Sequence, residues 1–248
     1  MPKLLLIGLL LFCSILVGTL TARPVQKKGT LIPQRFEKKI KKQLELAYWL
    51  FLPNDYHPKS KTGYPMILFL HGAGERGDDL EKVKIHGIPK VAMADSTFPF
   101  IVLAPQCPEN GWWTEYSDEL NGLIEAVIEH YAVDTNRIYI TGLSMGGFGT
   151  WDMAIRYPHR FAAIAPICGG SLPILAHRIQ HLPVWAFHGV KDPVVPVAFS
   201  EEMIKKLQSL NAPVKLTLYP DAGHDSWTET YNNPELYQWF LSQKKANQ

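Results

Sequence analysis

Short apolar runs and amphipathic segments alternate along most of the chain. Six runs have the continuous apolar character of buried strands, at 65–72, 100–106, 137–144, 161–168, 183–189 and 214–220. Two segments between them, 118–130 and 199–210, place apolar residues at helical spacing. Apolar strands separated by helices are typical of a parallel sheet that is covered on both faces. We therefore predict an α/β fold with a mostly parallel sheet of about eight strands and helices on both faces.

A lysine-rich stretch precedes the first of these strands. The run FEKKIKKQLELAYWLFLP at 36–53 alternates enough to predict two antiparallel edge strands with lysines on the solvent face. Charged residues on an edge strand keep the sheet from pairing with other chains. We interpret this charge run as a solvated sheet edge and not as a binding patch.

The N-terminal segment has the pattern of an export signal. Residues 4–20 are uncharged and mostly apolar, and small and polar residues follow up to Ala22. A run of this length also reaches the lower edge of a membrane span, so an uncleaved membrane anchor is the alternative. We predict a signal peptide at 1–22, a single catalytic domain at 23–248, and a periplasmic or secreted location.

Charge and cysteine content narrow the possible partners. The chain has 25 Lys+Arg and 23 Asp+Glu residues, a net charge of +2 that is spread along the sequence, which disfavours nucleic acid as a partner. Outside the signal segment only Cys107 and Cys168 remain, and each closes an apolar run. We interpret both as small buried hydrophobic residues, with one disulfide between them as the alternative. No metal-ligand spacing is present, so we predict no metal and no cofactor.

The motif Gly142-Leu143-Ser144-Met145-Gly146 lies between a predicted strand and a predicted helix. A G-x-S-x-G match alone arises by chance in about 0.1 of chains of this length. The strand before it and the helix after it supply the context of a serine nucleophile. A strained turn has to lift the serine oxygen out of the sheet, and the flanking glycines clear space for that turn.

A serine nucleophile needs a histidine base that is oriented by a carboxylate, here in the chain order Ser, Asp or Glu, His. His224 follows the last predicted strand in a glycine-flanked loop, and Asp192 follows the strand before it. Both therefore fall at the carboxyl edge of the sheet, where sites of α/β proteins lie. Asp152 in the helix after Ser144 and Asp221, close to His224 in sequence, are the weaker carboxylate candidates.

Two further histidines lie next to glycines at strand ends. His188 ends a strand directly before Gly189, and we interpret it as structural. His71 begins the turn His71-Gly72-Ala73-Gly74 and comes too early in the chain for the catalytic base. This turn is suited to donate a backbone N–H to an oxyanion, and we predict Ala73 N–H and Met145 N–H as the pair. Each such donor contributes about 3 to 4 kcal/mol to transition-state stabilisation.

Five sequence blocks occur in a fixed order: LHGAGERGDD, APQCPENGWW, DTNRIYITGLSMGGFGTWDMA, HGVKDPVVP and AGHDSW. Together they resemble the α/β-hydrolase superfamily, and within it the exported esterase and feruloyl-esterase-like group that is also labelled predicted peptidase or phospholipase/carboxylesterase-like. The resemblance spans Phe36 to Leu241. It implies a triad of Ser144, Asp192 and His224 and cofactor-free ester hydrolysis through an acyl-enzyme.

Loop lengths and aromatic residues bear on the substrate. Only residues 169–182 separate two strands where many lipases insert a lid, so we expect no large cap domain. Trp112, Trp113 and Trp227 follow strands at the predicted catalytic edge, and we predict that they line the substrate pocket, with core packing as the alternative. Small-molecule or carbohydrate esters with short, acetyl or feruloyl acyl groups fit such a site. A peptidase on the same fold and an inactive binding protein are the competing hypotheses.

Overall fold

The computed structural model describes residues 31, 35–39 and 41–245. Contacts divide the chain into two units, Met1–Lys42 and Gln43–Gln248, and the second contains all of the described helices and strands. The predicted signal peptide lies outside the described residues. Within the described part of the chain, no helix is both long enough and apolar enough to cross a bilayer.

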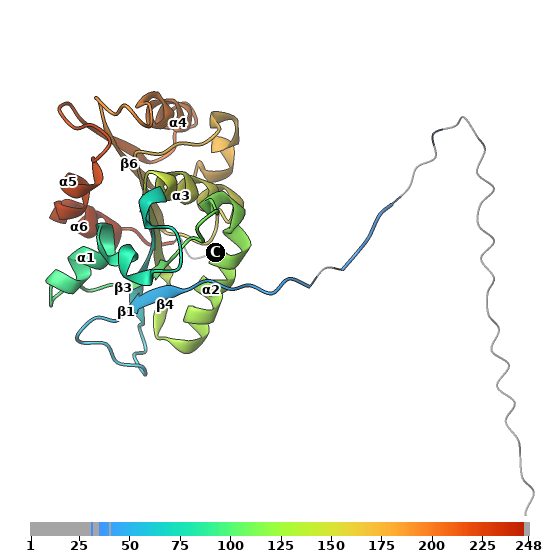
Figure 1. Ribbon diagram of the computed structural model, residues 1–248, viewed down its shortest axis with the longest axis vertical. Coiled ribbons are helices and arrows are strands. Elements are labelled where there is room, and N and C mark those ends of the chain that lie inside the picture. Colours follow the sequence, from blue (N-terminus) through green and yellow to red (C-terminus); the bar gives the residue numbers. More distant parts are fainter. Residues whose placement is uncertain (1–30, 32–34, 40, 246–248) are drawn as a thin grey trace, which may run out of the picture. The chain divides into compact units, whose positions relative to one another are not determined.

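Seven strands form one sheet in the order β1-β3-β2-β4-β5-β6-β7 (Figure 1). Their bounds are β1 Tyr48–Phe51, β2 Tyr64–Leu70, β3 Ile101–Pro105, β4 Val133–Leu143, β5 Ala163–Ile167, β6 Val184–Gly189 and β7 Val214–Tyr219. Only β1 runs antiparallel to its neighbour, β3. The predicted mostly parallel sheet and all six of its apolar strands are confirmed.

The number of edge strands differs from the prediction. The described residues contain β1 but no strand in 41–47, so the sheet has seven strands and not about eight. This stretch offers only Leu44 and Leu46 as large apolar residues, and Leu44 remains 43% exposed. A strand needs one buried face to fix its register, and the lysine-rich run does not provide one.

Helices cover both faces of the sheet, as expected (Figure 1). The α-helices are α1 Gly87–Ala94, α2 Ser117–His130, α3 Met145–Arg156, α4 Ala198–Gln208, α5 Trp227–Asn232 and α6 Pro234–Ser242. Short 3-10 helices are η1 Ala73–Glu75, η2 Leu80–Lys84, η3 Trp113–Glu115 and η4 Pro173–Ile179. Helices α2, α3 and α4 pack on one face of the sheet, and α1, α5 and α6 pack on the other. Between β5 and β6 the chain forms only η4, and no large cap is present in the described residues.

The sheet separates two hydrophobic cores. Along β2, Met66 and Leu68 face the core beneath α2 and α3, whereas Ile67 and Phe69 face the core beneath α1 and α6. Successive side chains of a strand point to opposite faces, so a strand that is apolar at every position serves both cores. The apolar runs of β2, β3, β5 and β6 therefore have this double burial as their physical cause, whereas β7 at the sheet edge is only partly buried and contains the exposed Lys215.

Two glycines allow the loops at the carboxyl edge of the sheet to approach one another. A Cβ atom on Gly146 would lie 1.9 Å from the carbonyl oxygen of Leu70, at the end of β2. A Cβ atom on Gly189 would lie 2.0 Å from the carbonyl oxygen of Gly223. Because these positions lack a side chain, α3 can begin against β2 and the loop after β7 can rest on the end of β6.

Candidate active site

Ser144 occupies a strained turn between β4 and α3. Its backbone has φ 53° and ψ −115°, a conformation that L residues other than glycine rarely adopt. The Ser144 N–H donates to the carbonyl oxygen of Ile167 at 3.0 Å, and the Ser144 carbonyl accepts from Phe148 N–H at 3.1 Å. The turn thus lifts the serine hydroxyl to the edge of the sheet at the N-terminus of α3, where backbone N–H groups have no partner within the helix.

His224 connects this serine to a carboxylate. Its Nε2 lies 2.9 Å from Ser144 Oγ, and its Nδ1 lies 2.7 Å from Asp192 Oδ2. A carboxylate only accepts hydrogen bonds, so Nδ1 carries the proton and Nε2 is free to accept the serine proton. The structure therefore brings together the three residues that the sequence predicted, from loops after β4, β6 and β7.

Asp192 is held as a carboxylate by its surroundings. Its side chain is fully buried, and Oδ1 accepts hydrogen bonds from Val194 N–H at 2.8 Å and Val195 N–H at 2.9 Å. Burial acts to raise the pKa of Asp192, but the hydrogen bonds from His224 and the two backbone amides outweigh it and lower that pKa below its ordinary value. The carboxylate can therefore orient the imidazole ring and stabilise its charged form.

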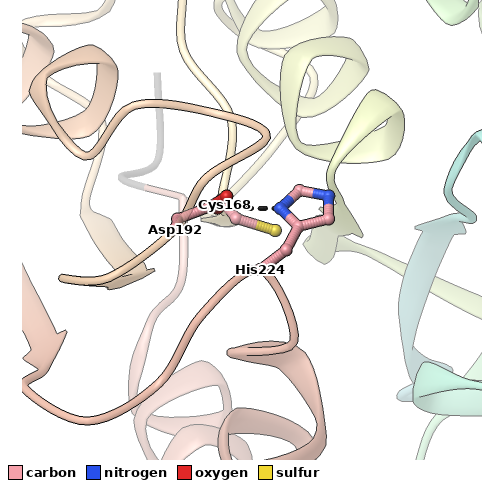
Figure 2. A group of neighbouring side chains, drawn as sticks. All are labelled: Cys168, Asp192 and His224. Atoms are coloured by element: carbon pink, nitrogen blue, oxygen red, sulfur yellow. Dashed lines mark hydrogen bonds and ion pairs between the residues drawn. The ribbon is translucent and has the colours of Figure 1, made fainter.

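Cys168 lies beside Asp192 and His224 (Figure 2). One potential ligand atom from each of the three residues lies within 4.8 Å of the others. Burial raises the pKa of the Cys168 thiol to about 12, so the group is a neutral thiol, whereas metal ions bind the thiolate. The hydrogen bond between Asp192 and His224 already uses the other two ligand atoms. This donor set fits a hydrogen-bonded site better than a metal site.

The two cysteines of the described chain are packing residues. Cys107 and Cys168 are both free and buried, which confirms the first interpretation and not the alternative disulfide. Cys168 has a positive φ of 39°, and its Sγ accepts a hydrogen bond from Ser144 N–H at 3.3 Å. A small side chain at the end of β5 thus supports the backbone of the serine turn.

The loop after β2 is fixed by buried hydrogen bonds. His71 Nε2 accepts from Cys107 N–H at 2.9 Å, and Nδ1 donates to the Gly72 carbonyl at 2.6 Å. Burial lowers the pKa of His71 to about 4, so the ring is neutral at pH 7. Trp113 is fully buried and donates its indole N–H to the His71 carbonyl at 2.9 Å. His71 and Trp113 therefore hold the loop in place from beneath.

Ala73 begins η1 directly after this loop, and Met145 is the first residue of α3. Arg76 donates to the Ala73 carbonyl at 3.0 Å and to the Gly111 carbonyl at 3.2 Å, which ties η1 to the loop after β3. The close approach of Gly146 to the end of β2 brings the two elements together. The placement is compatible with the predicted pair of backbone donors, Ala73 N–H and Met145 N–H.

Other aromatic residues gather at the same edge. Trp112 is 39% exposed, and its ring centroid lies 6.3 Å from that of Phe148, which in turn lies 5.8 Å from Phe199. Trp227 meets the His224 ring edge-on, with 5.3 Å between centroids. Of the three tryptophans that the sequence singled out, Trp112 and Trp227 are thus partly accessible, whereas Trp113 is buried beneath the loop.

The alternative carboxylates are engaged elsewhere. Asp152 accepts hydrogen bonds from Ser117 Oγ at 2.6 Å and from Arg156 Nε at 2.7 Å. Asp221 pairs with Lys191 at 2.7 Å on the exposed surface. Neither residue is placed to orient the His224 ring.

Two residues at the site were not recognised from the sequence as part of it. Arg76 ties η1 to its neighbouring loop, and His188, interpreted as structural, lies 3.3 Å from Asp192 Oδ2. Arg76 lies within the block LHGAGERGDD, and His188 comes four residues before Asp192, but neither position in the sequence specifies these contacts.

Comparisons with known proteins show the family to which the chain belongs. A family model described as Phospholipase/Carboxylesterase matches residues 109–234, just over half of the chain. The chain belongs to the phospholipase/carboxylesterase family. Its sheet and its structural neighbours identify the α/β-hydrolase fold.

Individual relatives of this family member are more distant. A bifunctional acetylxylan esterase/xylanase from Neocallimastix patriciarum is 26% identical to this chain, and the match covers 77% of this chain and 27% of that protein. Feruloyl esterase D from Neurospora crassa is 23% identical over 74% of this chain and 67% of its own length. A solved structure, described as a thermostable esterase, matches with a TM-score of 0.72 and 37% identity over 82% of this chain and 60% of that chain.

The family match includes part of the candidate site only. Ser144, Asp192 and His224 lie within residues 109–234, whereas Ala73 and Arg76 precede that segment. For this phospholipase/carboxylesterase family member, the family match therefore says nothing about the loop after β2, and the role proposed for that loop is argued from the structure.

Proposed function

We propose that this protein is a serine carboxylesterase in which Ser144, His224 and Asp192 form the catalytic triad. The observation that carries the proposal is the continuous pair of hydrogen bonds from Ser144 Oγ to His224 Nε2 at 2.9 Å and from His224 Nδ1 to Asp192 Oδ2 at 2.7 Å. A base within hydrogen-bond distance of the nucleophile, itself oriented by a third group, is the arrangement that nucleophilic catalysis requires.

The reaction proceeds in two halves. His224 Nε2 takes the Ser144 proton while Ser144 Oγ attacks the ester carbonyl carbon, which forms a tetrahedral oxyanion. The C–O bond to the alcohol then breaks, and His224 returns the proton to the leaving alcohol oxygen, which leaves an acyl-enzyme on Ser144. Water then attacks the acyl carbon while His224 Nε2 takes its proton, the bond from the acyl carbon to Ser144 Oγ breaks, and His224 returns the proton to Ser144 Oγ as the acid leaves. Asp192 holds the ring and offsets its positive charge in both halves.

The oxyanion is stabilised by the N–H groups of Ala73 and Met145. Support comes from their positions at the starts of η1 and α3, where backbone N–H groups have no partner within the helix. Arg76 supports the first donor by holding the Ala73 carbonyl at 3.0 Å.

The substrates are esters with short acyl groups or esters of carbohydrates and phenolic acids, of the acetyl or feruloyl type. The short connection from β5 to β6 supports an uncapped site, and accessible Trp112 and Trp227 supply aromatic surface near the triad. Relatives described as acetylxylan and feruloyl esterases point to the same substrate classes. Residues 1–22 direct export, and the protein acts after that export. N-terminal sequencing of the mature protein tests cleavage near Ala22.

The first test compares hydrolysis of nitrophenyl acetate, butyrate and dodecanoate by the wild type and by Ser144→Ala. Turnover of the two short esters should fall on the order of a millionfold in the variant. Ser209→Ala, which alters an exposed serine at the end of α4, is the matched control and should keep full activity. A loss below about tenfold in Ser144→Ala would refute the triad, and a preference for dodecanoate would refute the short-acyl assignment.

A second measurement extends the test to natural ester classes. Methyl ferulate and an acetylated xylan oligosaccharide are supplied to the wild type, and the released acid is quantified. Turnover of neither, with nitrophenyl acetate still cleaved, would leave the esterase assignment standing and remove the phenolic and carbohydrate substrates from the proposal.

A further inference from the structure

His188 is a fully buried residue of β6 that contacts Asp192, a member of the candidate triad. Its Nε2 lies 2.9 Å from the Val195 carbonyl oxygen and 3.3 Å from Asp192 Oδ2. Its Nδ1 lies 2.8 Å from Ser200 Oγ. None of the proposed ester-hydrolysis steps uses this imidazole. A buried polar side chain destabilises the fold unless it is hydrogen-bonded, and both nitrogens of His188 have partners.

The partners of Nε2 determine its role. The Val195 carbonyl only accepts hydrogen bonds, so Nε2 carries a proton and donates it to this oxygen at 2.9 Å. Asp192 Oδ2 lies 3.3 Å from the same nitrogen, as a close polar contact beside that hydrogen bond. The Val195 N–H in turn donates to Asp192 Oδ1 at 2.9 Å. His188 therefore acts on the carboxylate by fixing Val195, the residue that holds Oδ1, and its ring also lies against Oδ2.

The ring itself is fixed from behind. Ser200 Oγ lies 2.8 Å from His188 Nδ1 and 3.0 Å from the Gly169 carbonyl, which follows β5. Ser200, at the start of α4, is also fully buried. The imidazole is thus clamped between the end of β5 and the turn that carries Asp192, and cannot rotate without breaking these bonds.

We propose that His188 is a positioning residue for ester hydrolysis, whose Nε2–H, by holding the Val195 carbonyl, fixes the orientation of the Asp192 carboxylate toward His224. This inference rests on the proposed function of the Ser144, His224 and Asp192 site. Without the His188 donor, the Val195 carbonyl loses its partner, and the turn whose Val194 and Val195 N–H groups hold Asp192 Oδ1 is fixed less firmly. The carboxylate then loses part of its fixed orientation. The His224 ring then loses its fixed orientation toward Ser144.

The test uses the full chain with two substitutions at position 188. His188→Leu removes the donor while keeping an apolar side chain of moderate size, and His188→Gln places an amide N–H near the position of the imidazole Nε2. We expect the leucine variant to lose about 10- to 100-fold in kcat, by analogy with supporting partners of catalytic metal ligands, with KM changed less than about threefold. The glutamine variant should recover to within about fivefold of the wild type.

A spectroscopic readout separates positioning from loss of stability. The His224 Nδ1–H bonded to Asp192 should give a low-field proton NMR resonance in the wild type and in His188→Gln, and this signal should be lost or broadened in His188→Leu. Tyr139→Phe is the control, because it removes another buried hydrogen bond, from Tyr139 Oη to the Gln243 carbonyl at 2.8 Å. It should lower the melting temperature and leave both the resonance and kcat unchanged.

The outcomes are distinct. Wild-type kcat and an intact resonance in His188→Leu overturn the inference, and so does a His188→Gln variant as impaired as His188→Leu. If the leucine variant does not fold, Ser200→Ala decides, since freeing the ring should lower kcat several-fold and broaden the resonance, and no change in either overturns the inference.

The rate at which a fluorophosphonate labels Ser144 is measured in parallel. If the wild type is labelled but cleaves no ester, the proposed function fails. The labelling rates of the position-188 variants then still decide the inference, with a slower rate in His188→Leu and a near-normal rate in His188→Gln supporting it.

Discussion

The indole N–H of Trp113 donates a 2.9 Å hydrogen bond to the carbonyl oxygen of His71, and the two rings meet at 64° with 5.0 Å between their centroids. This contact joins the loop after β3 to the loop after β2, which carries the proposed oxyanion donor Ala73. A preorganised donor is effective only when it is held at the position where charge develops. The bond between Trp113 and His71 therefore links a fully buried side chain to the chemistry at the edge of the sheet.

Replacing Trp113 with Phe should lower kcat about tenfold and change KM little. The variant keeps an aromatic ring but leaves the His71 carbonyl without its donor, so the loop that carries Ala73 becomes less rigid. An oxyanion donor raises kcat by about 100-fold or more, and a displaced donor loses part of that effect. Steady-state kinetics with nitrophenyl acetate measure the change.

Trp151→Phe is the matched control for this substitution. Trp151 is also a fully buried tryptophan, but its indole nitrogen has no hydrogen-bond partner among the residues that the structure describes, so the change removes no hydrogen bond seen there. Both variants lose similar packing, but Trp113→Phe should unfold at the lower temperature, because it also leaves a buried carbonyl without a donor. An equal loss of kcat in the two variants would show that packing, and not the bond to His71, is what matters.

The stability of the fold should fall between pH 6.5 and pH 4 through His71. Burial lowers the pKa of His71 from 6.5 to about 4, so the unfolded chain binds a proton in this window that the folded chain does not. Stability from this group is complete above pH 6.5 and is lost as the pH falls toward 4, by about 3 kcal/mol in total. Urea unfolding at half-unit pH intervals measures the slope.

His71→Gln is the variant that isolates this effect. A glutamine side chain can accept the Cys107 N–H but does not titrate, so the variant should be less stable at pH 7 and should show a flatter profile down to pH 4. Asp192 does not interfere, because its pKa lies below its ordinary value and its contribution is lost only at lower pH. An unchanged slope in His71→Gln would assign the acid sensitivity to other groups.

The sequence predicts the parts of this molecule that follow from local pattern and chain order. The apolar runs located β2 to β7, and they are most continuous in β2, β3, β5 and β6, which are buried on both faces. The glycine-flanked Ser144 with His224 later in the chain located the candidate triad. The start of β4 was placed too late, because its first residues VDTN are polar and pair with β2 only through an irregular register at Tyr64 and Val133.

Contacts between distant segments could not be read in the same way. The bond from Trp113 to His71 joins residues 42 apart, and the approach of His188 to Asp192 depends on a turn whose shape is set by hydrogen bonds to the carboxylate. A buried histidine at a strand end looks the same in sequence whether it fills space or supports a catalytic group. Hydrogen-bond partners, which only the fold supplies, distinguish the two cases.

The thiols should be unreactive in the folded protein. Burial raises the pKa of Cys107 and of Cys168 to about 12, and both side chains are inaccessible. In the chain from residue 23 onward, Ellman's reagent at pH 8 should modify neither thiol in the native state and both after unfolding in guanidinium chloride. Rapid native reaction of one thiol, assigned with Cys168→Ala, would contradict the burial of that residue.

Trp112 should contribute to the binding of aromatic acyl groups. It is 39% exposed at the carboxyl edge of the sheet, its ring contacts Phe148, and Phe148 in turn contacts Phe199. An aromatic acid bound beside Ser144 can therefore pack on the Trp112 ring. Trp112→Ala should raise KM for methyl ferulate about fivefold, equivalent to about 1 kcal/mol, and leave KM for nitrophenyl acetate unchanged.

Trp49→Ala is the control for this substitution. Trp49 is 36% exposed on β1, and it donates its indole N–H to the Leu80 carbonyl. Equal changes for the two esters, or the same effect in Trp49→Ala, would mean that Trp112 supports the loop and does not contact the acyl group.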